Sequence, residues 1–438
     1  MNIAVIGSGI AGMSVAWLLN KHHKVTVYEK NQRIGGHSNT VDALTKDGLQ
    51  PVDTGFIVYN ERNYPNLTAL FEHLNVPTRD SEMSFSASLE SGGYEYAGTD
   101  LNGLFGQRSN LVSPRFWRMI KDLLRFYKEA PIFLKTSGEN DLSLGAYLAR
   151  QNYSDGFLKD HLLPIGAAIW STTAAEMQAY PAKAFIRFFE SHGLLLIRNR
   201  PQWRTVDGGS REYVKRLTRD YINRIKFGGV KSVRRFPDHV EITDVAGDIS
   251  TYDHVVIAAH ADEAIALLTD PDTHEKTLLG SWRYTENRAV LHSDPKLMPR
   301  RPRVWSSWNF METQPSQATN SLCVTYWMNR LQSIGPDNPL FLTLNPNTEP
   351  AAGTIFEEFT YSHPFFDAAA LATQSQLWSL QGKNRTWYCG SYFGYGFHED
   401  ALQSSLAVAE QLGGLKRPWQ VENESGRIQL SAGERVVQ

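Results

Sequence analysis

Apolar and polar positions at the start of the chain follow the periods of a strand, a helix and a second strand. Residues 2–7 form a short apolar run, and residues 13–19 form an apolar segment typical of a buried helix. Residues 24–30 (KVTVYEK) are rich in β-branched residues, which favour strands. The loop Gly7-Ser8-Gly9-Ile10-Ala11-Gly12 separates the first strand from the helix. The pattern therefore predicts a strand–helix–strand unit at the very start of the sequence.

Strand and helix patterns return in the middle and at the end of the chain. Residues 104–150 and 170–187 have helical periodicity, whereas residues 278–360 mix strand-like pieces such as 321–327 with loops. Short strands are predicted at 230–235, 239–244, 254–259 and 386–389, and helices at 210–217 and 401–412.

This alternation predicts an α/β protein with one discontinuous Rossmann-like domain. We expect residues 1–75, 205–275 and 380–438 to form a dinucleotide-binding domain. The segments between them, residues 76–204 and 276–379, would then form an inserted α+β substrate domain.

Composition and charge narrow the class of protein. The chain has 438 residues, 42% of them hydrophobic, which predicts a folded protein of two or three domains. Its 44 basic and 46 acidic residues argue against nucleic acid as the main partner. Two cysteines, Cys323 and Cys389, cannot build a disulfide framework or a four-cysteine zinc site, and no cluster has metal-ligand spacing. Neither a signal peptide nor a membrane-spanning apolar run is visible, so we expect a cytoplasmic protein.

The glycine loop has the residues that dinucleotide binding requires. Gly7 permits a tight turn, Gly9 lets the backbone approach a pyrophosphate, and Gly12 lets the helix pack close to the strand. The helix N-terminus then directs unpaired N–H groups and a partial positive charge at the phosphates. Glu29 ends the second strand, where a carboxylate accepts hydrogen bonds from ribose hydroxyls.

Two further glycine-rich segments favour FAD over NAD. Arg33-Ile34-Gly35-Gly36 offers a second close approach of the backbone and a cation for the phosphates, unless these glycines only turn the chain. Residues 390–401 (GSYFGYGFHEDA) open the last helix, whose N–H groups can face the electron-rich edge of a flavin ring. A nicotinamide cofactor would not need this third element.

These motifs resemble those of the flavin-containing amine oxidase superfamily, which includes monoamine oxidases, protoporphyrinogen oxidases and phytoene desaturases. The middle block, with Gly208-Gly209 and the strand 254–259, is similar as well. The resemblance implies non-covalently bound FAD in a domain of the glutathione reductase 2 type, with Val230 holding the adenine through its backbone. The implied cofactor-binding residues are Gly7, Gly9, Ile10, Ala11, Gly12, Glu29, Lys30, Arg33, Gly35, Gly36, His37, Val230, Gly390, Ser391, Phe397, His398, Glu399 and Ala401.

A closer resemblance runs over nearly the whole chain. Residues 52–60 (VDTGFIVYN), 169–171 (IWS), 191–195 (SHGLL) and 396–400 (GFHED) are similar to one branch of the superfamily. It contains amine-oxidase-like flavoproteins associated with cyclopropane fatty acid synthases, and bacterial flavin-dependent desaturases of methyl-branched fatty acyl chains. The branch implies an acyl-lipid substrate and a lipid methyltransferase as partner.

Several positions depart from the superfamily pattern. Ser391 stands where many members have an acidic residue, and Phe397 stands at the position of an aromatic-cage tyrosine, with Tyr395 nearby. The lysine that many amine oxidases hold near the flavin has no secure counterpart, and Asn287-Arg288 is its nearest match. These differences disfavour an amine substrate. Cys389 precedes the glycine-rich loop, so we expect a buried strand residue rather than a covalent flavin anchor.

Chemistry restricts the substrate further. A flavin takes a hydride, or its equivalent, from a carbon beside nitrogen or beside a double bond. At other carbons nothing stabilises the positive charge that loss of the hydride leaves behind. Apolar runs such as Phe188-Phe189 and Leu194-Leu195-Leu196 form either an ordinary core or a long apolar tunnel. We expect an FAD-dependent desaturase that acts on an allylic carbon of a methyl-branched or cyclopropane-related acyl chain. The alternatives are a flavin amine oxidase and a non-catalytic flavoprotein partner of a lipid methyltransferase.

Side chains near the glycine motifs can accept the proton that desaturation releases. Histidine suits this role because its unperturbed pKa is about 6.5. His192 and Glu399 are further candidates, and for every candidate a structural hydrogen bond is the alternative role. The expected catalytic residues are His37, Tyr59, Tyr395 and His398.

One predicted helix is strongly basic. Residues 108–135 contain seven basic and two acidic residues, with Phe116, Ile120, Leu123 and Tyr127 at helical spacing. Such a helix suits the surface of an anionic membrane, or else it packs on its own domain with a solvated cationic face. The expected partners are a lipid-like substrate and a membrane surface, with the protein peripheral on the inner face of the membrane.

Overall fold

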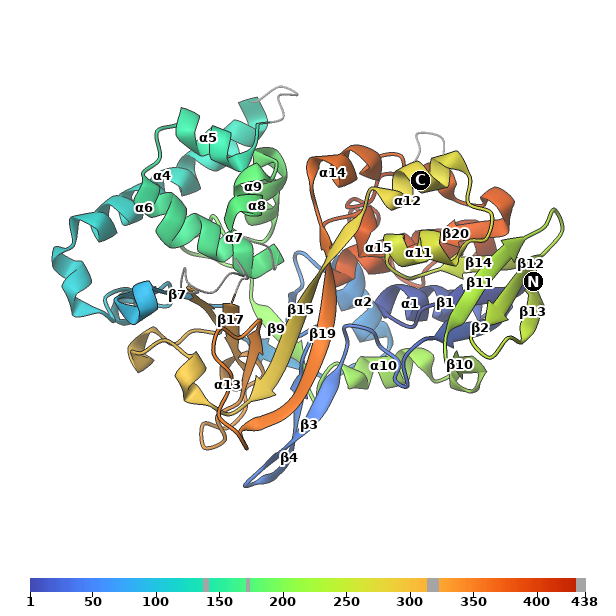
Figure 1. Ribbon diagram of the computed structural model, residues 1–438, viewed down its shortest axis with the longest axis horizontal. Helices are drawn as coiled ribbons and strands as arrows, with labels where there is room; N and C mark the ends of the chain where they lie inside the picture. The colour runs from blue at the N-terminus through green and yellow to red at the C-terminus, as the bar shows by residue number, and fades with distance from the viewer. Residues whose placement is uncertain (137–141, 171–173, 313–322, 431–438) are drawn as a thin grey trace.

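A parallel sheet of five strands brings together three separate stretches of the chain (Figure 1). In spatial order its strands are β10 (Ile225–Phe227), β2 (Lys24–Glu29), β1 (Asn2–Ile6), β14 (His254–Ile257) and β20 (Thr386–Tyr388). This sheet confirms the predicted α/β class with a Rossmann-like core. The computed structural model describes residues 1–136, 142–170, 174–312 and 323–430. Ser171 and the first two residues of the predicted strand 321–327 lie outside this part.

Helices α1 (Ile10–Leu19) and α15 (His398–Gly413) pack against each other beside the parallel sheet. All ten residues of α1 are buried, as expected for a helix that is apolar on every side. It begins three residues earlier than the apolar pattern indicates, because Gly9 serves as its N-cap. Helices α10 (Arg211–Thr218) and α2 (Pro65–His73) pack against α1 and α15, respectively.

Smaller elements complete this half of the molecule. A three-stranded antiparallel sheet lies beside the parallel sheet, on the right of Figure 1. Helices α11 and α12 pack against each other, and α11 contacts the first strand of that sheet. The elements are β11 (Val230–Arg235), β12 (Val240–Asp244), β13 (Ile249–Tyr252), α11 (Ala261–Leu267), α12 (Thr273–Gly280) and α14 (Ala368–Gln374).

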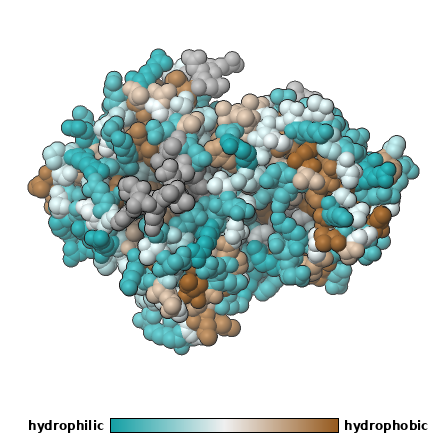
Figure 2. Space-filling view, in the orientation of Figure 1, coloured by the Kyte–Doolittle hydropathy of each residue, from teal (hydrophilic) through white to brown (hydrophobic). Residues whose placement is uncertain are grey.

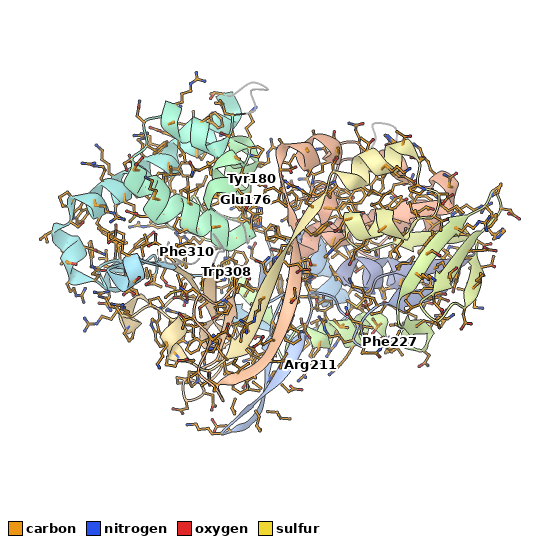
Figure 3. The ribbon with its side chains drawn as sticks, in the orientation of Figure 1. Glu176, Tyr180, Arg211, Phe227, Trp308 and Phe310 are labelled. Atoms are coloured by element: carbon orange, nitrogen blue, oxygen red, sulfur yellow. The ribbon has the colours of Figure 1, made fainter. Side chains whose placement is uncertain are left out.

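A mixed sheet of seven strands forms the other half. Its two longest strands pair side by side and cross the middle of the view in Figure 1. Trp308 and Phe310 lie on this sheet, near the helices that cover it (Figure 3). In spatial order the strands are β19 (Ile355–Phe365), β15 (Arg283–His292), β18 (Phe341–Leu344), β17 (Cys323–Trp327), β16 (Trp308–Met311), β7 (Phe85–Leu89) and β8 (Tyr94–Ala97).

A layer of helices lies beside the seven-stranded sheet. The helical pattern predicted for 104–150 is divided into several helices, the longest of which is α4 (Pro114–Thr136). In the described part of the chain no helix is both long and apolar enough to cross a membrane. The other helices are α3 (Leu101–Leu104), α5 (Leu144–Arg150), α6 (Asp155–Phe157), α7 (Leu163–Trp170), α8 (Ala174–Ala179), α9 (Ala182–Ser191) and α13 (Met328–Leu331).

Short strands connect the two halves. The hairpin of β3 and β4 projects at the bottom of Figure 1. A small sheet is formed by three further strands, in the order β5, β9 and β6. These strands are β3 (Thr40–Thr45) and β4 (Gly48–Asp53), and β5 (Tyr59–Asn60), β9 (Trp203–Val206) and β6 (Thr78–Ser81).

Candidate active site

A cavity of about 1360 Å³ extends from the carboxyl ends of the parallel strands to the helical layer. Open α/β sheets bind their ligands at this edge, outside the ends of the strands. Pockets for drug-sized ligands typically have volumes of about 300–1000 Å³. The cavity therefore has room for an extended cofactor together with a second molecule.

The first glycine loop leaves open space where its predicted ligand would lie. Gly7 has a φ of +100°, and a Cβ there would lie 2.6 Å from the Ala258 carbonyl oxygen. A Cβ on Gly12 would lie 1.9 Å from the Gly7 oxygen, so this glycine allows helix and strand to pack closely. A Cβ on Gly9 would meet no atom within 4 Å, and Gly9 lines the cavity. These positions fit a pyrophosphate held against the backbone of the loop.

Glu29 joins the first glycine loop to the chain that follows the second strand. Its Oε2 accepts hydrogen bonds from the backbone N–H and the hydroxyl of Ser8, at 3.0 and 2.5 Å. Its Oε1 accepts from the N–H of Asn31 at 2.8 Å. A carboxylate has about four acceptor positions, so this buried, cavity-lining group retains capacity for a ribose hydroxyl.

The second glycine pair packs directly on the first loop. The N–H of Gly35 donates to the Ser8 oxygen at 2.9 Å, and a Cβ on Gly36 would lie 2.9 Å from the Gly9 Cα. Arg33 lines the cavity and donates from Nη1 to the Gly36 oxygen at 2.8 Å. The Arg-x-Gly-Gly segment thus supports the first loop while it presents a guanidinium to the same space.

The start of α15 forms the third element of the cofactor end. The N–H of Phe397 donates to Asp400 Oδ2 at 2.8 Å, which caps the helix. Asp400 is also paired with Arg427, so the cap is held from two sides. His398 and Phe397 line the cavity at this helix N-terminus, where the helix dipole favours negative charge.

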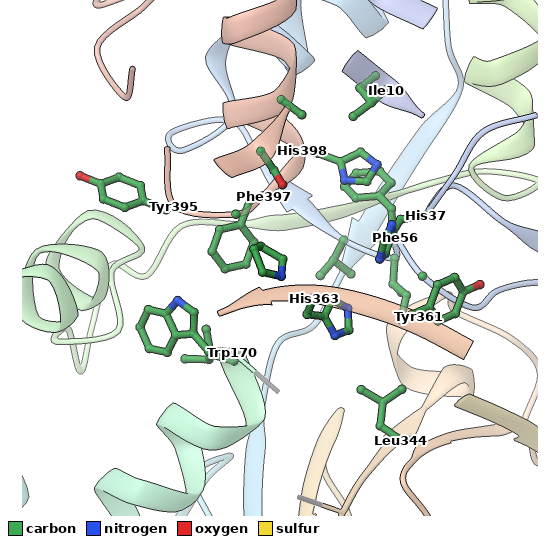
Figure 4. A pocket seen from close by; sticks show the side chains of 18 of the residues that line it. Ile10, His37, Phe56, Trp170, Leu344, Tyr361, His363, Tyr395, Phe397 and His398 are labelled. Atoms are coloured by element: carbon green, nitrogen blue, oxygen red, sulfur yellow. The ribbon is translucent and has the colours of Figure 1, made fainter. Parts of the chain in front are cut away.

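Histidine and aromatic rings meet between these three elements (Figure 4). The ring of His37 lies 5.1 Å from that of Tyr361 and 5.4 Å from that of His363. His398 stacks on Phe56 at 3.9 Å. In Figure 4, Trp170, Tyr395 and Phe397 lie on one side of the cavity, and His37, Phe56 and His398 lie on the other. Burial holds the pKa of His37 well below its usual value, so its ring is neutral at pH 7.

Two histidines have their proton position fixed by neighbours. Asn345 Nδ2 donates to Asn287 Oδ1 at 2.7 Å, and Asn287 Nδ2 then donates to His363 Nδ1 at 3.0 Å. His363 therefore carries its proton on Nε2. His192 Nδ1 lies 2.9 Å from the Phe188 carbonyl oxygen, which can only accept, so here the proton is on Nδ1. The Nε2 of His192 is a buried acceptor without a protein partner in the described part of the chain.

Most of the predicted cofactor and catalytic residues line this cavity. Those that line it are Gly7, Gly9, Ile10, Ala11, Glu29, Lys30, Arg33, Gly36, His37, Val230, Gly390, Ser391, Tyr395, Phe397, His398 and Ala401. His192, a further candidate, lines it too. The cavity lining does not include Gly12, Gly35, Tyr59 or Glu399.

Tyr59 and Glu399 have structural partners away from the cavity. The Tyr59 ring packs edge-on against Phe71 at 5.2 Å, and its hydroxyl bonds Thr78 and Arg204. Glu399 accepts hydrogen bonds from the N–H of Leu67 at 3.0 Å and from other donors of α2, and so joins α2 to α15. Their positions give neither side chain access to a ligand in this cavity.

Two other positions that the sequence analysis singled out, Asn287-Arg288 and Cys389, can also be located relative to the cavity. Arg288 pairs with Glu349 and Glu358 on the exposed side of β15, so Asn287 is the member of that dipeptide that faces the histidines. Cys389 is fully buried and is not part of the cavity lining.

Sequence reasoning missed His260, Tyr361 and His363. Tyr361 and His363 lie two residues apart on β19 and share one face of the strand. The alternation of Phe359, Tyr361 and His363 was the available signal, because such a pattern predicts a strand with one aromatic face.

The far end of the cavity is apolar. The rings of Trp170 and Phe188 lie 4.7 Å apart, and Phe188 stacks on Phe397 at 5.1 Å. Beyond these rings, α4 and α7 supply aliphatic side chains. The apolar residues lining this end include Leu104, Ile120, Leu123, Leu124, Ile165, Ile169, Leu194 and Ile197.

The neutral histidines predict a protein that loses stability in acid. Burial lowers the pKa of His161 and His363 to about 4 and that of His192 and His398 to about 3. The unfolded chain, with histidine pKa values of about 6.5, binds protons that the folded chain refuses as the pH falls from 6.5 to 4. We expect the free energy of unfolding in urea, at constant excess FAD, to fall by about 1 kcal/mol per histidine between pH 7 and 5.5.

His161→Gln should reduce this pH dependence, and the same change at the exposed His22 should leave it intact. Equal pH slopes for the wild type and His161→Gln would contradict the assignment.

Comparisons with known proteins agree with a flavin site at the glycine motifs. A family model described as flavin containing amine oxidoreductase matches residues 10–333. A search of curated proteins finds no significant match.

Several solved structures share the fold. A putrescine oxidase bound to putrescine aligns with a TM-score of 0.67 and 13% identity, over 94% of this chain and 99% of the other. Cyclohexylamine oxidase from Brevibacterium oxydans aligns with a TM-score of 0.67 and 14% identity, over 94% and 99%. A CLA-producing fatty acid isomerase from P. acnes aligns with a TM-score of 0.65 and 14% identity, over 92% and 96%. At these identities the likeness extends to the fold alone.

Proposed function

Because this chain belongs to the flavin-containing amine oxidoreductase family and is an FAD-dependent oxidoreductase, we propose that it desaturates a fatty acyl chain at an allylic carbon. The acyl chain is methyl-branched or related to a cyclopropane fatty acid, as the closer resemblance of residues 52–60 and 396–400 implies. FAD, when bound at the glycine motifs, would supply the hydride acceptor for the reacting carbon. The chain supplies position, a dry environment and a proton acceptor.

The apolar end of the cavity carries this proposal. It continues from the histidine cluster past Trp170 and Phe188 to the aliphatic side chains of α4 and α7. An acyl chain buries its methylene groups favourably there, at roughly 0.8 kcal/mol each. The cavity volume of about 1360 Å³ leaves space for such a chain beside FAD. The fold also occurs in a fatty acid isomerase, so it is compatible with a fatty acyl ligand.

The carboxylates of the cavity do not favour an ammonium substrate. In the described part of the lining, the carboxylates are Glu29, Asp100 and Glu263. Glu29 binds Ser8, Asp100 accepts from the N–H of Gly103 at 2.7 Å, and Glu263 pairs with Lys30. The aromatic rings near Phe397 can still hold a cation by their faces. Amine oxidation is therefore the rival function, favoured by the amine oxidases that share the fold.

We infer that His192 takes the proton that desaturation releases. Formation of a new double bond requires loss of a hydride from one carbon and of a proton from its neighbour. His192 Nε2 has a free lone pair, because the Phe188 carbonyl fixes the proton on Nδ1. The ring lies 5.9 Å from that of Phe397, among the aromatic side chains that line the cavity.

Anaerobic mixing of the holoenzyme with two substrate classes tests the proposal. We expect unsaturated, methyl-branched acyl lipids to bleach the flavin absorbance and to gain one double bond per flavin reduced, as mass spectrometry would show. Putrescine and cyclohexylamine serve as the comparison set. Bleaching by these amines without bleaching by acyl lipids would overturn the desaturase proposal and establish the amine oxidase.

A further inference from the structure

The cavity opens to the surface beside α4, and its rim is apolar. Leu101, Leu124 and Ile197 line the cavity and are also among the most exposed large apolar side chains, with 74%, 49% and 65% of their surface accessible. Arg200 lines the same region and hydrogen-bonds Tyr127 of α4. Exposed apolar rims of this kind usually mark a binding surface.

Further exposed apolar residues lie outside the rim. Leu111 and Val112 precede α4, and Val112 is 83% exposed. Trp117, in the first turn of α4, donates from Nε1 to the Leu111 oxygen at 2.9 Å and is itself exposed. The cavity lining does not include these three residues, so a ligand confined to the cavity would leave them in water. The surface suits a partner larger than one substrate molecule.

Unpaired cations accompany these apolar residues. Of the seven basic residues in 108–135, Arg115 and Arg125 form ion pairs with nearby carboxylates. No carboxylate within the described ranges pairs with the other five, which are Arg108, Arg118, Lys121, Lys128 and Lys135.

The two kinds of residue alternate along one face of α4. Trp117, Lys121, Leu124 and Lys128 follow one another at helical spacing, and all four are exposed. Helix α4 belongs to the left-hand lobe of Figure 1, and the side of that lobe seen in Figure 2 has scattered hydrophobic residues among hydrophilic ones. The opposite face of α4, with Phe116, Met119 and Phe126, is buried in the protein's own core, so only this mixed face is available to a lipid surface.

We propose that this mouth surface, formed by the apolar rim, Leu111, Val112, Trp117 and the five unpaired cations, docks on an anionic phospholipid bilayer. Docking would place the opening of the cavity against the acyl chains of the bilayer. The inference deepens the proposed function, because the choice of a phospholipid bilayer as the partner rests on an acyl-lipid substrate. Tryptophan is favoured at the boundary between lipid and water, and lysine and arginine bind anionic head groups. A second copy of the chain fits this surface less well, because a two-fold contact would bring the five cations against the same five.

Cosedimentation of the holoenzyme with vesicles tests the docking. We expect binding to vesicles of phosphatidylcholine mixed with phosphatidylglycerol, little binding to phosphatidylcholine alone, and release by high salt, which screens the charges. The double variant Lys121→Glu/Lys128→Glu should weaken binding to the mixed vesicles by about tenfold or more. Trp117→Ser/Val112→Ser should weaken it without changing the salt dependence.

The matched control is Lys276→Glu/Lys383→Glu, which makes the same change of charge at exposed positions of the other half of the molecule. It should bind vesicles as the wild type does. Equal binding to both vesicle types, or equal loss in the control and the α4 variant, would overturn the proposal. So would salt-sensitive self-association in place of vesicle binding.

Vesicle binding requires no turnover, so the two proposals fail separately. If acyl lipids leave the flavin oxidised but the α4 charges govern vesicle binding, only the desaturase proposal is wrong. If dispersed acyl lipids bleach the flavin and anionic vesicles do not bind the protein, only the docking proposal is wrong.

Discussion

Gly9→Val should produce a folded, colourless protein. The added side chain would point into the open space beside the glycine loop, where no protein atom lies within 4 Å of the Cβ position. The backbone of Gly9, at φ −67° and ψ 179°, is accessible to any residue, so the change costs the fold little. Overlap with the pyrophosphate should reduce FAD affinity by about 100-fold or more. Flavin absorbance of the purified protein and titration with FAD measure the effect.

Two other glycines separate loss of the cofactor from loss of the fold. Gly280→Val adds the same side chain at another open position, away from the cavity, and should keep its FAD. Gly12→Ala would place a Cβ 1.9 Å from the Gly7 oxygen, so it should lower the free energy of unfolding even without FAD. A yellow Gly9→Val protein with wild-type affinity would show that the cofactor does not approach this loop.

The same variant distinguishes an enzyme from a scaffold. If the protein acts only as a partner of a lipid methyltransferase, a folded, flavin-free chain would still support that partner. We expect instead that cells with only the Gly9→Val protein have the lipid profile of cells without the gene.

The cofactor end of the cavity could be predicted because its signals are local. Gly7, Gly9 and Gly12 act within six residues of one another, and the turn, the close approach and the helix start are decided there. The strands from distant parts of the chain were predictable for a related reason. Strands buried on both faces, such as the one that contains residues 255–257, appear as short continuous apolar runs.

The catalytic end of the cavity depends on contacts that leave no local signal. His37 and His363 are far apart in sequence, and their rings approach because β19 lies against the segment that follows the second glycine pair, where the Tyr361 hydroxyl bonds Asn39 and Thr54. The proton position on His363 depends in turn on Asn345, which reaches it through Asn287. A single sequence contains the residue types but not the register that joins them.

Tyr59 shows the same dependence on register. It is among the expected catalytic residues, but residues 59–60 pair with β9 and turn the ring toward Phe71, outside the cavity lining. His192 is the converse case. It is only a further candidate from the sequence, yet the end of α9 brings it to the cavity beside Phe188 and Phe397.

His192→Gln should retain FAD and lose most of its activity. Glutamine keeps a donor for the Phe188 carbonyl, but unlike imidazole it cannot accept a proton at neutral pH. General base catalysis typically contributes about 10²–10⁴-fold. Because burial lowers the pKa of His192 to about 3, its ring is a weak base, so the rate of anaerobic flavin reduction by the acyl substrate should fall by about 10²-fold, the low end of that range. KM should change little, because the loss concerns a proton in the transition state rather than binding of the chain.

Two further histidine variants decide whether this effect belongs to His192 alone. His292→Gln changes a buried histidine that bonds Thr343 outside the cavity, so it should reduce the flavin at nearly the wild-type rate. His37→Gln tests the other cavity histidine whose Nε2 is buried without a protein partner in the described residues. A large loss in His37→Gln together with a nearly normal rate in His192→Gln would assign the proton to His37. The proton on His192 Nδ1 favours the opposite result, because it leaves a lone pair on Nε2, which has no protein partner in the described residues.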